Sequence, residues 1–164
     1  DGTEARAAGH GWPDCGFTLI ELVMVIVLLG ILAAVAGLRL SVSAVDVSAQ
    51  AEQLAADIRY TQALAMSRGQ RFRVNFTASS YQITDMNGVA QMHPATGQTA
   101  AVSLAPTSLS GYNPPLGNSY LAFDGRGVPF TAPATALAST VTITLSAGGD
   151  THAVRVAPET GHVQ

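Results

Sequence analysis

Cysteine is almost absent from this chain of 164 residues, and lysine is missing altogether. The single cysteine is Cys15, so no disulfide can form within the sequence, and the fold must rely on packing and hydrogen bonds, or on an ion that the sequence does not reveal. All eight basic residues are arginine, and the formal charge is −3. So weak a charge balance gives no general attraction for nucleic acid, and no nucleic-acid partner is expected. Proline is missing between Pro13 and Pro94, so none interrupts a helix in that stretch.

Recognised signatures of catalysis and metal binding are missing as well. No serine stands in a Gly-x-Ser-x-Gly elbow, and the histidines and aspartates match no known metal-ligand spacing. Five residues could be imagined as metal ligands, but we interpret them as surface loop residues. They are His93, His152, His162, Asp124 and Asp150. We therefore expect no catalytic residue, no metal and no cofactor, and we predict that the protein is not an enzyme.

One long apolar run extends from Gly16 to Leu38, and it contains a single carboxylate, Glu21. A helix over 17–38 would be about 33 Å long, close to the thickness of roughly 30 Å of a bilayer core. The run therefore predicts a membrane-spanning helix. A charge in hydrocarbon is costly unless it is paired, so Glu21 requires a partner.

Other interpretations of the apolar run explain less. A cleaved secretory signal would use the small residues at 34–36, but its apolar core normally has about 7–15 residues and follows a basic segment. Residues 1–15 contain Arg6 against three acidic residues, so that basic segment is missing. An ordinary signal anchor remains an alternative, but it leaves Glu21 without a role.

The segment Gly16–Glu21, GFTLIE, resembles the processing motif of the type IV pilin superfamily. The resemblance implies that a prepilin peptidase removes a leader, 1–16, by cutting between Gly16 and Phe17, and that the new amine of Phe17 is then N-methylated. It also implies a partner for Glu21, namely the Phe17 amine of a neighbouring subunit. That pairing would set the register of helix packing during assembly.

Beyond Leu38 the apolar pattern keeps helical spacing, which predicts an amphipathic half of the same helix over 39–69. The apolar line consists of Leu38, Val42, Val45, Ala49, Leu54, Ile58 and Ala65. The residues expected to face water are Asp46, Glu52, Asp57 and Arg59. We expect the helix to end at Arg68, with Gly69 as a left-handed cap.

Residues 70–164 predict a β-rich head. Phe72, Val74 and Phe76 alternate with polar residues, as in a strand with one buried face. Further strands are expected at 81–84, 89–92, 102–104, 120–123, 141–145 and 153–157. Turns are expected at 87–88, 124–127 and 148–149, and a long loop over 93–119. The predicted fold class is α+β, a long N-terminal helix that carries a small antiparallel β-sheet head.

Three later segments narrow the resemblance. They are 59–63 (RYTQA), 123–127 (FDGRG) and 158–163 (PETGHV), and they resemble the GspH/FimT-type minor pseudopilins and minor pilins. The resemblance implies a structural minor pseudopilin of the type II secretion system, at or near the tip of the periplasmic pseudopilus. The alternative is a minor pilin of a type IV pilus, of the FimT-like or mannose-sensitive-haemagglutinin type. A DNA-uptake module is less favoured, because no Lys or Arg follows Arg155.

The resemblance also implies partners and a location. The partners are the prepilin peptidase, other pseudopilins or pilins packed against the N-terminal helix, and the inner membrane before assembly. The chain would cross the bacterial inner membrane once, with its head in the periplasm. Arg68, Arg71 and Arg73 form a small basic cluster, which we interpret as a solvated helix end and strand face, with a subunit contact as the alternative.

Overall fold

The structure, a computed structural model, describes residues 18–164, apart from the side chains of 35–45. Its first element is one helix, α1 (Leu19–Arg68), of 50 residues. The chain divides into two compact units between Leu38 and Arg39, and α1 continues through this division. Antiparallel sheets follow the helix, so the predicted α+β class is confirmed.

The end of α1 has the predicted glycine cap. Gly69 has a φ of +60°, and the N–H of Gln70 donates a hydrogen bond to the carbonyl oxygen of Ala65 at 3.3 Å. This bond satisfies a carbonyl of the last turn that has no partner within the helix. The helix therefore stops at Arg68, as predicted.

The buried stripe of α1 matches part of the predicted apolar line. Leu54, Ile58 and Ala65 are buried as expected, together with Val47 and Ala51. The prediction for Ala49 is wrong, because its side chain is exposed. At about 100° per residue, position 49 points away from the stripe through 47, 51, 54 and 58. Leu38, Val42 and Val45 have side chains outside the described residues.

The larger sheet has six antiparallel strands in the order β3-β2-β1-β5-β6-β7. Its strands are β1 (Phe72–Phe76), β2 (Ser80–Asp85), β3 (Val102–Ser103), β5 (Tyr120–Phe123), β6 (Pro129–Ala132) and β7 (Thr135–Ala136). In β1 the three apolar residues are buried and the residues between them are half-buried, as the alternation predicted. Val74 pairs with Ile83 on one side and Leu121 on the other, which places an apolar face on the helix side.

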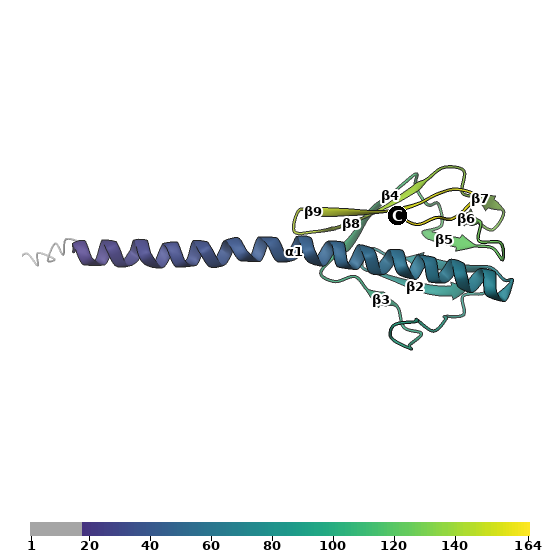
Figure 1. Cartoon of the computed structure of the whole chain (residues 1–164), viewed down its shortest axis with the longest axis horizontal. Coiled ribbons are helices and arrows are strands. Elements are labelled where there is room, and N and C mark those ends of the chain that lie inside the picture. Colours follow the sequence, from purple (N-terminus) through teal and green to yellow (C-terminus); the bar gives the residue numbers. More distant parts are fainter. Residues whose placement is uncertain (1–17) are drawn as a thin grey trace, which may run out of the picture. The chain divides into compact units, whose positions relative to one another are not determined.

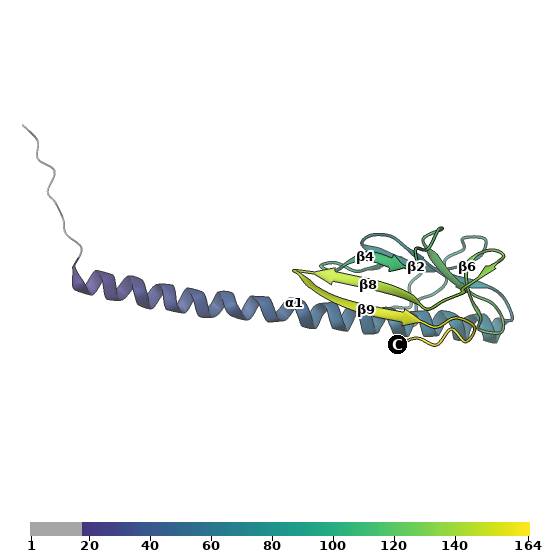
Figure 2. The ribbon, with the colours of Figure 1, turned by 90° about the horizontal axis from the view of Figure 1, so that it is seen from above.

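The smaller sheet has three antiparallel strands in the order β4-β8-β9. They are β4 (Ser108–Asn113), β8 (Val141–Ala147) and β9 (Asp150–Val156). Gly148 and Gly149, with φ of +60° and +96°, form the predicted turn between β8 and β9. In Figures 1 and 2 both sheets lie beside the C-terminal half of α1, and the β8–β9 hairpin runs along it. Val141, Ile143 and Leu145 belong to the same hydrophobic core as Leu54 and Ile58.

Two predicted segments of the head are wrong, and the strands β6 and β7 were not predicted. The turn at 87–88 forms, with Gly88 N–H donating to Asp85 O at 3.2 Å, but 89–92 contains only a bridge from Ala90 to Thr84 instead of a strand. The predicted loop over 93–119 contains not only β3 but also β4. The sequence of β4, SLSGYN, has the composition of a turn, and its pairing with β8 is irregular between Leu109 and Gly111.

Candidate functional site

The first turn of α1 has a side-chain cap. The N–H of Glu21 donates to Thr18 Oγ1 at 3.3 Å, and the N–H of Leu22 donates to Thr18 O at 3.2 Å. Thr18 is therefore the N-cap, and Glu21 stands at the third helical position, the spacing of a capping box. The positive end of the helix dipole favours a carboxylate here. The Glu21 side chain is exposed, and none of the described residues pairs with its carboxylate.

Large apolar side chains surround the helix after this turn. From Leu19 to Leu32 they are exposed by 46% to 82% in the single chain. A helix that is apolar on every side needs apolar surroundings, supplied by lipid or by other helices. Within the described part of the chain, no helical stretch has both the length and the hydropathy needed to span a membrane.

The predicted processing site cannot be placed. Gly16 and Phe17, the residues on either side of the expected cut, lie outside the described residues, as does the predicted leader 1–16. The predicted membrane-spanning half, 17–38, ends among side chains that also lie outside them. Cleavage and N-methylation of Phe17 therefore stay predictions.

In the head, the three segments that carried the narrower resemblance meet at one side chain. Gln62 Nε2, on α1, donates to the carbonyl oxygen of Gly127 at 2.9 Å and to that of Thr160 at 2.7 Å. One helix turn away, Arg59 donates to the carbonyl oxygen of Val163 at 3.1 Å. The helix, the turn after β5 and the segment after β9 are joined here, and we call this contact the Gln62 junction.

Glycines allow the close approach at the Gln62 junction. Gly161 has a φ of +63°, and a Cβ atom there would lie 2.5 Å from Gln62 Nε2 and 2.8 Å from Gly127 O. A Cβ on Gly125 would lie 3.0 Å from the Gly69 backbone at the helix cap. Larger residues at these positions would push the three segments apart.

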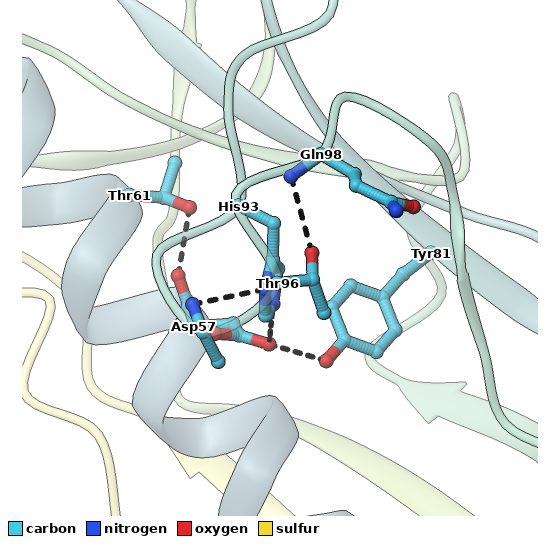
Figure 3. A network of polar contacts seen from close by, with 7 residues as sticks. Asp57, Thr61, Tyr81, His93, Thr96 and Gln98 are labelled. Atoms are coloured by element: carbon cyan, nitrogen blue, oxygen red, sulfur yellow. Dashed lines mark hydrogen bonds and ion pairs between the residues drawn. The ribbon is translucent and has the colours of Figure 1, made fainter.

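A buried polar network lies between α1 and the larger sheet (Figure 3). Asp57 Oδ2, from α1, lies 2.8 Å from His93 Nε2 and accepts a hydrogen bond from the hydroxyl of Tyr81 on β2. The three residues are 3%, 3% and 1% exposed. We call them the Asp57 cluster.

The Asp57 cluster corrects two predictions. Asp57 was expected to face water and His93 to be a surface loop residue, and both are wrong because both side chains are buried. The helical spacing contained the signal, since position 57 lies on the stripe of Leu54, Ile58 and Thr61, which are all fully buried. His93 has no comparable signal, because it lies outside any regular element.

The structure does not bring the considered metal ligands together. His152 and His162 are exposed, and Asp124 binds main-chain N–H groups in its own turn. Among the described residues, no group of three or more His, Cys, Asp or Glu side chains could hold a metal ion.

The arginines of the basic cluster lie over aromatic rings and do not pair with carboxylates. The guanidinium carbon of Arg71 lies 4.1 Å from the centre of the Phe130 ring, that of Arg73 lies 5.2 Å from Tyr120, and that of Arg68 lies 5.5 Å from Phe72. None of these three arginines forms an ion pair with a described residue. They stabilise the sheet by stacking, as Arg commonly does on aromatic faces.

The family to which the chain belongs follows from matches to two known protein families. The family described as type II transport protein GspH matches residues 50–160, which include the Gln62 junction and the Asp57 cluster. The chain belongs to the GspH family. The family described as prokaryotic N-terminal methylation motif matches residues 13–37, on the N-terminal side of the GspH match. The resemblance to GspH/FimT-type proteins of the type IV pilin superfamily is thereby confirmed, and the chain is a minor pilin or pseudopilin.

The chain is similar to the type IV minor pilin FimU of Pseudomonas aeruginosa strain PAO1 in two crystal forms. In space group P65 the identity is 15% and the TM-score 0.49, over 71% of this chain and 90% of FimU. In space group P21 the identity is 16% and the TM-score 0.49, over 72% and 86%. No curated protein sequence matches this GspH-family chain.

Proposed function

We propose that this protein is a structural minor pseudopilin of the type II secretion system that joins the pseudopilus at or near its tip. The observation that carries the proposal is the match of residues 50–160 to the type II transport protein GspH family, with a methylation motif at 13–37. Processing and helix packing are therefore encoded in one part of the chain, and a family-specific head in the other.

Assembly begins with processing in this proposal. The prepilin peptidase hydrolyses the Gly16–Phe17 bond, and the freed amine of Phe17 accepts a methyl group. Before assembly the chain lies in the inner membrane as a single-pass protein with its head in the periplasm. The apolar side chains of 19–32, exposed in the single chain, support this because lipid and neighbouring helices are both suitable surroundings for them.

Glu21 sets the register of packing in this proposal. Its carboxylate is exposed in the first turn of α1 and is unpaired within the described chain. A charged Phe17 amine of a neighbouring subunit would neutralise it as both leave the lipid. The role of the head is to choose neighbours, and neither part of the chain acts as an enzyme.

Deletion of the gene in its own host tests whether the protein serves the secretion system or a pilus. Loss of exported proteins from the medium, with pili unchanged, supports the secretion role. Loss of pili with normal secretion would assign the protein to a type IV pilus, and loss of DNA uptake alone would assign it to uptake. Complementation with the wild-type chain restores the phenotype, and Gly16→Val does not, because its leader stays attached. Mass spectrometry of both products shows whether cleavage leaves Phe17 as the methylated first residue.

A further inference from the structure

The proton positions in the Asp57 cluster follow from its contacts. The N–H of Ala95 donates to His93 Nδ1 at 3.3 Å, so this nitrogen carries no proton and Nε2–H donates to Asp57. Burial, followed by the hydrogen bond to Asp57, raises the pKa of Tyr81, which stays a protonated donor. The carboxylate of Asp57 therefore accepts from two neutral donors and leaves one negative charge buried.

No cation compensates this charge among the described side chains. Among the described residues, three ionisable groups are bonded to one another here: Asp57 on α1, Tyr81 on β2 and His93 in the segment after β2. Thr61, also on α1, donates to the main-chain oxygen of Asp57 at 2.8 Å. No arginine with a described side chain forms an ion pair with Asp57. Uptake of one proton would therefore neutralise the whole cluster.

His93 is also the root of an exposed loop, 94–98 (Figure 3). Its main-chain N–H donates to Gln98 O at 2.7 Å, its carbonyl oxygen accepts from Gly97 N–H at 2.9 Å, and its ring accepts from Ala95. The imidazole thus binds a buried carboxylate through one nitrogen and the loop backbone through the other.

We propose that the Asp57 cluster is a proton-operated latch for the surface loop 94–98. A proton taken up on Nδ1 forms an imidazolium–carboxylate ion pair with Asp57 and keeps His93 in place. It also turns Nδ1 into a donor that faces the N–H of Ala95, and two donors cannot bond. Acidification therefore releases Ala95 and loosens the loop, while the root of the loop stays fixed to α1.

NMR of the ¹⁵N-labelled full chain in detergent micelles tests the latch. At about pH 8 the imidazole of His93 should carry its proton on Nε2 alone. As the pH falls, Nδ1 should gain a proton, and the Ala95 amide resonance should follow the same titration curve. Protection of that amide from hydrogen exchange should fall about tenfold or more. His152 and His162 are exposed internal controls, and their titration should leave Ala95 unchanged.

His93→Gln separates proton uptake from packing. Its amide can still donate to Asp57 but cannot be protonated, so Ala95 should no longer respond to pH. Three results with the wild-type chain would each overturn the proposal: Nδ1 already protonated at about pH 8, Nδ1 still unprotonated at the lowest pH at which the chain stays folded, or protonation of Nδ1 that Ala95 does not follow. These results need no variant, so a misfolded His93→Gln chain leaves the test decisive.

Discussion

Gln62 donates a hydrogen bond from its side-chain amide to the carbonyl oxygen of Thr160, 98 positions later in the chain, at 2.7 Å. The same nitrogen donates to Gly127 at 2.9 Å. One side chain of α1 therefore holds both the turn after β5 and the segment after β9. This arrangement gives a physical reason why three short segments, far apart in the sequence, carried the resemblance to one family.

The head should fold without the apolar segment, metal or disulfide. Residues 46–164 contain the core shared by α1 and both sheets, and Cys15 lies outside them. We expect a soluble fragment with a cooperative unfolding transition, measured by circular dichroism in urea. Addition of a chelator should leave the spectrum and the midpoint unchanged. A large loss of structure with chelator would reveal an ion site in the head.

Gln62→Ala should destabilise this fragment by about 1–2 kcal/mol, because two main-chain carbonyl groups lose their donor. The measurement is the free energy of unfolding in urea. Gln53→Ala is the matched control, since Gln53 lies on the same helix with an exposed side chain. It should change stability by less than about 0.5 kcal/mol. Equal effects of the two substitutions would mean that the Gln62 junction adds nothing to stability.

Gly161→Ala should cost more than Gly97→Ala. The two glycines have nearly the same φ, +63° and +66°, so alanine is strained by about 1–2 kcal/mol at both. At Gly97 a Cβ meets nothing within 4 Å, whereas at Gly161 it meets Gln62 and Gly127 below 3.0 Å. We therefore expect Gly161→Ala to lower the free energy of unfolding by about 1–3 kcal/mol more than Gly97→Ala does. Urea unfolding of the fragment measures both variants. Similar losses would show that the segment after β9 shifts freely.

Sequence periodicity predicted the elements in which one face is clearly apolar. β1 and β8 alternate, and α1 combines an apolar run with a buried apolar stripe and a glycine cap, so these are confirmed. β4 was missed because its serines, glycine and asparagine also suit a turn, and only pairing with β8 selects the strand. Strand propensity alone cannot supply that long-range contact.

The candidate site residues also divide into those that the sequence reveals and those that depend on long-range contacts. Glu21 was found because a charge within an apolar run is conspicuous in the sequence. Asp57 was placed on the wrong face, because a carboxylate is normally exposed unless partners remove the cost of burial. Those partners are Tyr81 and His93, from 24 and 36 positions away. Local spacing does not reveal such a pairing, and the tertiary fold creates it.

Asp124 should make the stability of the head depend on pH. Burial alone would raise its pKa, but hydrogen bonds from the main-chain N–H groups of Val128 and Arg126, and the Arg126 side chain, hold the pKa below the ordinary 3.8. A lowered pKa in the folded state stabilises the head above the unfolded pKa, and this contribution is lost as the pH falls through the folded value. Asp124→Asn should therefore lower the free energy of unfolding in urea at neutral pH, and the difference from wild type should shrink as the pH falls below the ordinary 3.8. A constant difference across this range would assign the loss to geometry instead of charge.

Glu21→Ala should impair assembly without impairing membrane insertion or cleavage. The carboxylate is costly in lipid, so its removal should leave insertion at least as efficient, and the peptidase is expected to recognise chiefly Gly16. Fractionation and mass spectrometry of the host membrane check both points.

Recruitment into the filament should fall in the same cells, because the Phe17 amine of a neighbour loses its counter-charge. Cross-linking to the other filament subunits measures recruitment. The amount of exported protein, or the number of pili, measures the function of the filament. Glu21→Asp should be intermediate, since the shorter side chain reaches less far. Glu52→Ala removes an exposed carboxylate from the second half of α1 and is the matched control, with recruitment expected to be normal. Normal recruitment of Glu21→Ala itself would contradict the pairing and favour a terminal position in the filament, where no neighbouring subunit requires the carboxylate.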